Sequence, residues 1–173
     1  SPGMVATPVS GGYDVTYTPQ TALTDGAHTV TVSVSDNDGN PSVATAVTYK
    51  VDTVPPTLNI ASPADGLITS TAAQTIVGTT NDATSSPVVV TVSLNGTDQG
   101  AVSVSADGSF AKGITLAVGN NTIVVTSTDK AGKETSSTRH ATLDTTSPVI
   151  SAVTITPNPA DAGATLSISV TIA

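Results

Sequence analysis

The sequence predicts an all-β protein made of tandem antiparallel β-sandwiches, one of them complete and two of them partial. The first observation is composition, because Thr and Val favour strands while the frequent Gly, Pro, Asn and Asp favour turns. The second is that no window places apolar residues three and four apart over three turns, so α-helix has little support. The third is an internal repeat, which divides the chain into units of about 90 residues.

The repeat aligns residues 17–39 with residues 110–132. At an offset of 93, which becomes 92 after one residue is lost, the matched pairs are Tyr17 and Phe110, Leu23 and Leu116, Gly26 and Gly119, Val32 and Val125, Asp36 and Asp129, Gly39 and Gly132, Asp52 and Asp144, and Pro56 and Pro148. Turn-forming residues that match in the same order indicate that one fold occurs twice. Tyr17 and Phe110 occupy equivalent places, and we expect both in the core.

Strands are expected where apolar and polar residues alternate with a period of two, the pattern of a strand with one buried face. Val30, Val32 and Val34 show it across HTVTVSVS, residues 28–35. The other segments with this pattern are residues 49–51, 88–95, 101–105, 121–128 and the segment that ends at 141–143. Asn95-Gly96 and Asp107-Gly108 lie between such segments and predict hairpin turns. Six or seven short strands in about 90 residues predict a two-sheet sandwich of the immunoglobulin type.

Two proline-containing segments, VDTVPPT at 51–57 and LDTTSPV at 143–149, predict short and rather rigid joints. One complete domain is therefore expected at 53–146. Residues 1–52 are expected to hold the later strands of a preceding domain. Residues 147–173, through VTITP and TLSISVTI, are expected to form the first strands of a following one.

These residues carry a family resemblance. GSFAKGITLAVGNNTIVVTSTDKAGKE, residues 108–134, resembles bacterial immunoglobulin-like domains of the type appended to glucodextranase. YTPQTALTDGAHTVTVSVSDNDGN, residues 17–40, followed by VDTVPP, resembles related repeats of bacterial adhesins and surface proteins. The resemblance covers most of the chain and implies a fold and a type of module. It does not imply one function, because such modules serve many host proteins.

Charge and cysteine content exclude several classes of function. The net charge is −8, with twelve Asp against the single Glu134. Five Lys and Arg residues, scattered singly, do not form a nucleic-acid-binding surface, so no nucleic acid is expected as a partner. No apolar run is long enough to span a membrane. The absence of cysteine excludes disulfides, thiolate zinc sites and a cysteine nucleophile. A Thr- and Asp-rich chain that is poor in Lys favours an extracellular or cell-surface location in a bacterium.

No catalytic residue is predicted, and the chain is not expected to be an enzyme. His28 and His140 are the only imidazoles, and nothing in the sequence pairs either with a serine. There is no GxSxG motif. Every Asp except Asp14 and Asp98 can be assigned to a turn or to a domain end. No organic cofactor is implied.

A calcium site is the one candidate with a chemical basis. In DNDGN, residues 36–40, Asp36, Asp38 and Asn40 stand at alternate positions, and Gly39 permits a sharp bend. That spacing turns several oxygen atoms toward one point, as the opening of an EF-hand loop does. Asp52 ends the following strand and should return toward the domain end. The resemblance to calcium-stiffened adhesins implies that Asp36, Asp38 and Asp52 match ligands of Ca²⁺ between domains.

The alternative is that this loop is a turn without a metal. The second repeat has DKAGK at 129–133, which keeps Asp129 and Gly132 but has Lys130 and Lys133 beside them. The shared Asp and Gly are then a requirement of the turn, and any metal site would depend on the extra oxygen ligands of the first loop.

The predicted function is structural: a stalk, spacer or fibre segment of a long extracellular repeat protein, whose partners are neighbouring immunoglobulin-like domains. One hypothesis adds head-to-tail assembly, in which residues 149–172 of one chain complete the sheet begun by residues 1–52 of the next. The competing interpretation is that the two partial units belong to a segment of a longer repeat protein. An alternative function is an accessory, carbohydrate-associated module of a secreted polysaccharide-active enzyme.

Overall fold

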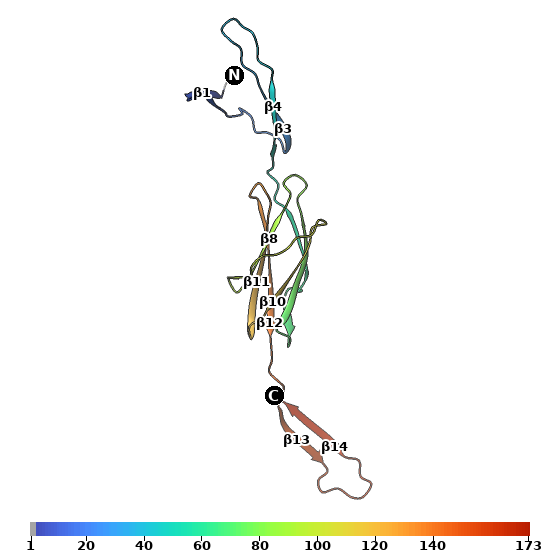
Figure 1. The fold of residues 1–173 in the computed structure, drawn as a ribbon. Coiled ribbons are helices and arrows are strands. Elements are labelled where there is room, and N and C mark those ends of the chain that lie inside the picture. The colour runs from blue at the N-terminus through green and yellow to red at the C-terminus, as the bar shows by residue number, and fades with distance from the viewer. Residues whose placement is uncertain (1–2) are drawn as a thin grey trace.

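The computed structural model describes residues 3–173, and strands are the only regular structure within that range. Three groups of strands follow one another along an extended molecule (Figure 1). We call them the first unit, the central sandwich and the third unit. The all-β class predicted from composition and periodicity is confirmed. No helix suited to crossing a membrane occurs in this part of the chain.

The first unit consists of two antiparallel hairpins. Its strands are β1 (Met4–Val9), β2 (Gly12–Tyr17), β3 (Gly26–Val32) and β4 (Thr45–Val51). In the second hairpin, Gly26 pairs with Val51 at the open end and Val32 pairs with Thr45 near the turn. The predicted strand at 28–35 is therefore present, although it begins two residues earlier and ends three residues earlier.

The central sandwich has two sheets. Its strands are β5 (Thr57–Ser62), β6 (Leu67–Thr69), β7 (Ala73–Asn81), β8 (Val89–Leu94), β9 (Thr97–Asp98), β10 (Ser109–Thr115), β11 (Gly119–Thr128) and β12 (Glu134–Leu143). One sheet has the order β10-β7-β5 and the other has the order β6-β12-β11-β8-β9. All neighbours are antiparallel except β6 and β12. This is the complete sandwich that the strand spacing predicted.

The core of the central sandwich comes from the inward-facing positions of these strands. Along β11, buried residues alternate with more exposed ones, and Ile123 and Val125 are completely buried. The other buried apolar residues are Ile60, Ile76, Val90, Val92, Leu94, Phe110, Ile114, Leu116, Ala141 and Leu143. Each large aliphatic side chain that leaves water in this way contributes about 1.5–3 kcal/mol to folding, and no disulfide is needed to close the sandwich.

One predicted core residue, Tyr17, is exposed. Its repeat partner Phe110 is 4% exposed and lies against β7, whereas Tyr17 is 57% exposed at the end of β2. The difference arises because β1 and β2 pair with each other alone, with no second sheet opposite them. The two residues also differ in their place in the strands, because Tyr17 ends β2 whereas Phe110 is the second residue of β10.

The predicted strand at 101–105 is also wrong. This segment forms a single bridge, between Val104 and Phe110, and no continuous ladder. Gly100, with a φ of 77°, precedes it, and the turn closed by the Gly108 N–H to Ser105 carbonyl bond (2.9 Å) follows it. Val102 and Val104 still pack on the core. The alternation in the sequence indicates correctly that these two side chains turn inward. It does not show whether the segment forms a continuous hydrogen-bonded ladder with another strand.

The predicted hairpin turns are present. Asn95 and Gly96 join β8 to β9 with φ values of 52° and 80°, the left-handed conformation that Asn-Gly adopts at low cost. Asp107 and Gly108 lie in the tight turn that leads into β10.

The third unit is one antiparallel hairpin of β13 (Ile150–Thr156) and β14 (Ser167–Ile172). These are the two strands expected from VTITP and TLSISVTI. Their side chains are exposed on both faces, as the burial patterns of the two strands show.

Candidate metal centre

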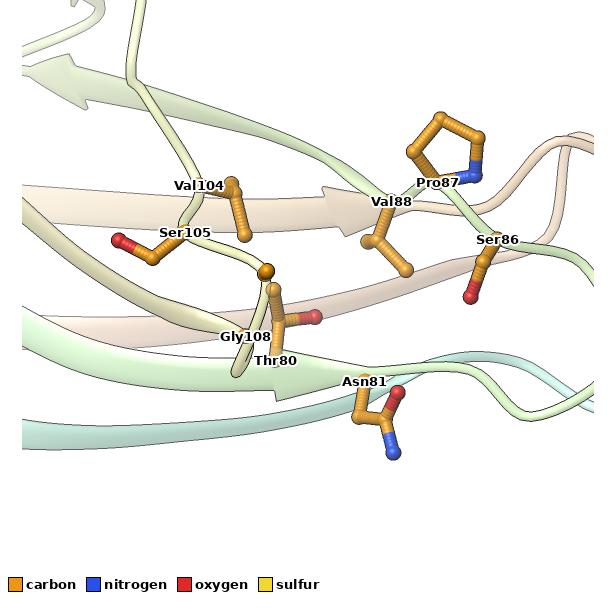
Figure 2. A pocket seen from close by; sticks show the side chains of 9 residues that line it. Thr80, Asn81, Ser86, Pro87, Val88, Val104, Ser105 and Gly108 are labelled. Atoms are coloured by element: carbon orange, nitrogen blue, oxygen red, sulfur yellow. The ribbon is translucent and has the colours of Figure 1, made fainter.

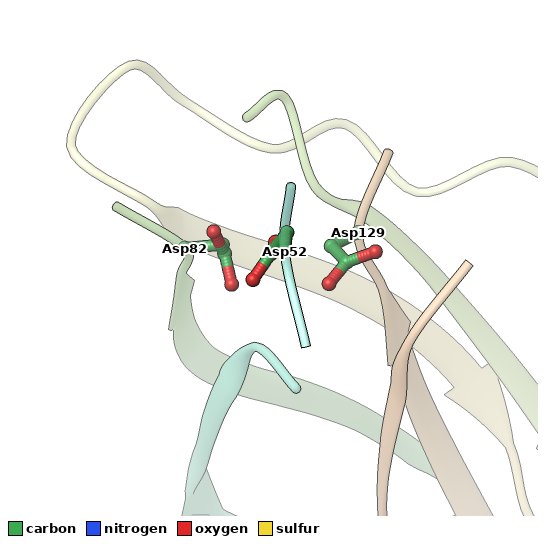
Figure 3. Close-up of side chains that lie close together, drawn as sticks. All are labelled: Asp52, Asp82 and Asp129. Atoms are coloured by element: carbon green, nitrogen blue, oxygen red, sulfur yellow. The ribbon is translucent and has the colours of Figure 1, made fainter. Parts of the chain in front are cut away.

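Three carboxylates meet where the first unit joins the central sandwich (Figure 3). Asp52 directly follows β4, Asp82 directly follows β7 and Asp129 directly follows β11. One oxygen atom from each lies within 4.8 Å of the others. We call these three residues the triad. Within residues 3–173, no other group of three Asp, Glu or His side chains brings its ligand atoms this close together.

The triad is largely removed from water. Asp82 is 7% exposed and Asp129 is 6% exposed, while Asp52 is half-buried. Carboxylates are almost never buried to this extent unless they are paired or bind a metal, because desolvation of a charge is costly. Two buried aspartates next to a third therefore require a partner that compensates their negative charge.

Each triad carboxylate uses one oxygen to hold its own loop. Asp82 Oδ1 accepts hydrogen bonds from the amides of Thr84 (2.8 Å) and Ser85 (2.6 Å). Asp52 Oδ1 accepts one from the amide of Val54 (3.1 Å). These are the short loops in which Asp bonds backbone amides two or three residues ahead, and they orient the carboxylates toward the joint.

Asp129 is held in the same way, and its turn is the repeat of the turn at Asp36. Asp129 Oδ1 accepts from the amides of Ala131 (2.7 Å) and Lys133 (2.9 Å). Asp36 Oδ1 accepts from the equivalent amides of Asp38 (3.0 Å) and Asn40 (2.8 Å). The two loops are therefore structurally equivalent, as the 93-residue offset predicted.

The second oxygen of two triad members has no protein partner. Oδ2 of Asp52 and Oδ2 of Asp129 are both buried and accept no hydrogen bond. Within the described residues the one ion pair is His140–Asp65, so no cationic side chain pairs with the triad. Lys50 lies nearby, but its ammonium donates to the carbonyl of Thr84 at 3.1 Å. Buried, unsatisfied carboxylate oxygens are rare in native proteins and commonly mark a missing ion or water.

The structure does not bring Asp36, Asp38 and Asn40 to Asp52. They lie in the loop that closes the β3–β4 hairpin, whereas Asp52 follows the opposite, open end of that hairpin. Oδ2 of Asp36 accepts a hydrogen bond from the Asn40 side-chain amide at 2.9 Å. Hydrogen bonds from the Asn40 side chain and backbone lower the pKa of Asp36. The loop has the geometry of the turn interpretation, with both oxygens of Asp36 satisfied internally.

Sequence reasoning included Asp52 but omitted Asp82 and Asp129. The signal for Asp129 is its equivalence to Asp36, but Lys130 and Lys133, which follow it, argue against a cation there. In the structure neither lysine forms an ion pair with a triad carboxylate. Nothing in the sequence singles out Asp82 as a possible ligand. It lies outside the segments that the repeat aligns, among several other residues typical of turns. Only the packing of β4 against the loops of the next unit brings the three together.

The remaining candidates offer no catalytic arrangement. A depression of about 230 Å³ is lined by Thr80, Asn81, Ser86, Pro87, Val88, Val104, Ser105, Ala106 and Gly108, none of them an acid or a base (Figure 2). His28 Nε2 lies 2.7 Å from the carbonyl of Thr24, and His140 Nδ1 lies 3.1 Å from Asp65 Oδ1. Within residues 3–173 neither imidazole forms a hydrogen bond with a serine hydroxyl, which is the arrangement a nucleophilic serine requires.

Comparison with known proteins agrees with the fold. Residues 56–145 match the family model of glucodextranase domain B, and residues 3–53 match that of a bacterial Ig-like domain. The fibronectin(III)-like modules of Clostridium thermocellum CbhA are 19% identical, with a TM-score of 0.49, over 82% of this chain and 78% of that one.

A tetra-tandem repeat from the extending region of a large adhesion protein is 22% identical, with a TM-score of 0.45. That match covers 96% of this chain and 50% of the other. No curated protein matches the sequence. Because residues 56–145 are slightly more than half of the 173, the protein belongs to the glucodextranase domain B family.

Proposed function

We propose that this chain is a non-catalytic structural segment that spaces other parts of an extracellular bacterial protein. The observation that carries the proposal is the way the first unit meets the central sandwich. Only residues 52–56 separate β4 from β5, and two of them are prolines. The first unit and the central sandwich therefore follow one another end to end, with little slack between them (Figure 1).

Hydrogen bonds on both sides of this joint support a rather rigid connection. The Lys50 ammonium, at the end of the first unit, donates to the Thr84 carbonyl of the central sandwich at 3.1 Å. Within the sandwich, the Thr135 hydroxyl donates to the Pro56 carbonyl at 2.6 Å. On the other side, Asp25 accepts from the amide and the hydroxyl of Thr53, both at 2.9 Å. The linker is thus tied to the unit before it and to the unit after it.

Small-angle X-ray scattering tests this proposal. Wild type should scatter as an elongated particle, and replacement of residues 53–56 by Gly-Ser-Gly-Ser should broaden its distance distribution, because flexible linkers sample many orientations. The same replacement of residues 145–148 tests the other predicted joint and should also broaden the distribution. A compact wild-type particle, or a variant indistinguishable from wild type, would contradict the spacer function.

Self-association of the chain through β13 and β14 is a more specific form of this function. β13 and β14 expose the apolar side chains of Ile150, Val153, Ile155, Ile168, Val170 and Ile172. They pair antiparallel, as β5 and β7 do, although the irregularity lies at the start of β13 and at the end of β5. In the central sandwich β7 also pairs with β10, so the hairpin of one copy is suited to complete the first unit of another. Light scattering against concentration tests this, and a monomer at every concentration would exclude it.

An accessory module of a secreted polysaccharide-active enzyme is the second candidate. The observation that favours it is exposure of the chain's tyrosines: Tyr13 is 69% exposed, Tyr17 57% and Tyr49 40%. Exposed aromatic rings are suitable surfaces for sugar rings to stack on. Co-sedimentation with insoluble α- and β-glucans separates the two functions, because a spacer should remain in solution with every polysaccharide.

A further inference from the structure

We propose that Asp38 and Gly39, in the loop of the β3–β4 hairpin, form a site of spontaneous backbone modification, at which aspartate isomerises to isoaspartate. This modification goes beyond the proposed spacer function and does not depend on it. The proposal rests on a comparison of every Asp-Gly and Asn-Gly pair in the chain. These pairs are Asp25-Gly26, Asp38-Gly39, Asp65-Gly66, Asn95-Gly96 and Asp107-Gly108.

The reaction needs only the chain and water. The backbone nitrogen of Gly39 attacks the side-chain carbon Cγ of Asp38 and loses its proton, and the hydroxyl of the protonated carboxyl group leaves with that proton as water. The product is a five-membered succinimide ring. Water then opens the ring: cleavage of the bond from nitrogen to Cγ restores aspartate, and cleavage of the bond from nitrogen to the main-chain carbonyl carbon gives isoaspartate. The water lost in the first step is regained in the second, so the mass of the chain does not change.

The surroundings of Gly39 permit this ring closure. A glycine has no side chain to obstruct the approach of its nitrogen to the carbon, and even an added Cβ at Gly39 would meet no atom within 4 Å. Both residues are exposed, and they lie beyond Val32 and Thr45, the last pair of the β3–β4 ladder. Loops of this kind open more readily than the ladder that they close.

Asp38 differs from the equivalent residue of the other pairs in the freedom of its side chain. All five of these Asp and Asn residues are exposed, so exposure does not distinguish them. Within residues 3–173 the Asp38 carboxylate accepts no hydrogen bond, although its backbone amide donates to Asp36 Oδ1 at 3.0 Å. The carboxylate can therefore rotate toward the Gly39 nitrogen without the loss of a contact.

The carboxylates of Asp25 and Asp107 are held in place by hydrogen bonds. Asp25 Oδ1 accepts from the amide and from the hydroxyl of Thr53, both at 2.9 Å. Asp107 Oδ1 accepts from the amide of Ser109 at 3.0 Å and from its hydroxyl at 2.7 Å. Each side chain must lose these bonds before its Cγ can reach the next nitrogen, and the loss of two bonds slows the attack by about tenfold or more.

The pair Asp65-Gly66 isolates the effect of the side chain. In this pair, as in Asp38-Gly39, the glycine nitrogen donates to a backbone carbonyl, at 2.8 Å for Gly66 and 3.1 Å for Gly39. Asp65 Oδ1 in addition accepts from the amide of His140 at 2.7 Å and from its ring at 3.1 Å. The nitrogens of the two pairs are therefore restrained alike, and only the Asp38 side chain is free.

The pair Asn95-Gly96 is the one that the sequence alone would single out, because the neutral amide of asparagine is attacked more readily than an ionised carboxylate and then releases ammonia. In the structure both ends of the Asn95 amide are bonded. Its Nδ2 donates to Asn121 Oδ1 at 3.0 Å, and its Oδ1 accepts from the amide of Thr122 at 2.8 Å. The fold therefore protects the most reactive pair and leaves Asp38-Gly39 unprotected.

The second repeat contains the same turn without the reactive side chain. The loop at 129–133 has the same amide-to-carboxylate hydrogen bonds as the loop at 36–40. At the position of Asp38 it has Ala131, which also precedes a glycine but cannot close the ring. Asp38→Ala therefore introduces a residue that this turn already accommodates, and the variant should fold as wild type does.

Isoaspartate should loosen the loop, because it adds one carbon atom to the main chain between the Cα of Asp38 and the nitrogen of Gly39. Asp36 Oδ1 accepts from the amides of Asp38 and Asn40, which lie on either side of the added atom. The two amides cannot both keep their positions. We expect faster amide hydrogen exchange at residues 36–42 of the isoaspartate form, and unchanged exchange in the central sandwich.

Ageing of the folded chain at physiological temperature, followed by digestion with trypsin, tests the proposal. Cleavage after Lys50 and Lys112 gives peptides 1–50 and 51–112, which separate the Asp38 site from the Asn-Gly pair. Peptide 1–50 should divide into two species of equal mass, and electron-transfer fragmentation should place isoaspartate at Asp38. Peptide 51–112 should keep its mass, because its asparagine is protected.

Two controls accompany this measurement. Asp38→Ala, checked for folding by circular dichroism, should form no isoaspartate in peptide 1–50. The second control is wild type aged in urea, where the hydrogen bonds of the fold are absent. There Asn95 should deamidate about tenfold faster or more than in the folded chain, and Asp25 should isomerise as fast as Asp38.

Three outcomes would overturn the proposal. The first is a folded chain without isoaspartate at Asp38 after a time that suffices to deamidate Asn95 in urea. The second is isomerisation of Asp25 or Asp107 in the folded chain as fast as that of Asp38. The third is deamidation of Asn95 at the same rate in the folded and the unfolded chain, which would show that the hydrogen bonds give no protection. Equal hydrogen exchange at residues 36–42 in both forms would exclude the effect on the loop.

Discussion

Gly78 shows how one residue position decides the packing of the core. A Cβ atom at Gly78 would lie 2.5 Å from the Asn59 carbonyl oxygen and 2.6 Å from the Phe110 ring. β7 therefore passes the ring and the neighbouring strand β5 at a distance that only glycine permits. The sequence identified Phe110 as a core residue, but nothing in it revealed that a glycine on another strand makes room for the ring.

We predict that Gly78→Ala destabilises the central sandwich by about 2–3 kcal/mol, because either the ring or the backbone of β5 must shift. Gly113→Ala is the matched control, since Gly113 also lies in a strand and has open space around its Cβ position. Urea unfolding of both variants measures the difference. A Gly78→Ala protein as stable as the control would show that the contact relaxes without cost.

Asn121 illustrates a residue whose role the sequence does not reveal. It begins the predicted strand at 121–128 and lies in β11, yet this polar side chain is only 2% exposed. Its side chain donates to the carbonyls of Ala117 (2.7 Å) and Gly119 (2.9 Å) and accepts from the amide of Ala117 (2.9 Å). It also accepts from the Asn95 side chain at 3.0 Å. A buried amide with every group satisfied stabilises this loop, and local pattern does not reveal it.

Strand β12 shows what the sequence predicts at the scale of an element. Its end at residues 141–143 and its pairing with β11 follow from alternation and from the turn at Asp129. Its parallel pairing with the three-residue strand β6 could not be predicted, because it depends on contacts between residues far apart in the sequence. Asp65, which precedes β6, accepts hydrogen bonds from the amide of His140 at 2.7 Å and from its ring at 3.1 Å.

This contact predicts a pH dependence. The backbone and side-chain hydrogen bonds from His140 lower the pKa of Asp65 below its ordinary value of 3.8. A depressed carboxyl pKa stabilises the fold above the unfolded value, and that stabilisation is lost as the pH falls through the folded value. The difference in free energy of unfolding between wild type and Asp65→Asn should be constant above about pH 5 and shrink below about pH 4.

Urea unfolding between about pH 6 and pH 2.5 measures that difference. Asp161→Asn is the control for the loss of one surface carboxylate, because within residues 3–173 Asp161 takes part in a hydrogen bond only through its backbone carbonyl. A difference between wild type and Asp65→Asn that is independent of pH would contradict the assigned role of Asp65.

At the scale of the molecule, the predicted domain boundaries have a direct test. All the buried apolar residues lie between Ile60 and Leu143, inside the central sandwich. Residues 53–146 alone should therefore unfold in one cooperative transition, as small single domains do. A fragment that does not fold, or that unfolds in more than one transition, would contradict this expectation.

The sequence predicted the order of units and joints, because repeated Gly, Asp and Pro positions are local signals. The triad, in contrast, depends on how two units pack together. It forms only when the end of β4 lies next to the loops that follow β7 and β11. Asp52 could be identified from its place at a joint. Its partners could not, because which loops face a joint is decided by sheet topology, and residues 81–88 contain no pattern that reports it.

The two ends of the central sandwich have a mechanical consequence. β5 enters at the end that carries the triad, and β12 leaves at the opposite end, toward the third unit (Figure 1). Tension applied through the neighbouring units would pull β5 and β12 in opposite directions along their own axes. The hydrogen bonds of their antiparallel ladders lie perpendicular to that force, so many must break together rather than one after another. The sandwich is thus oriented to resist stretching in shear.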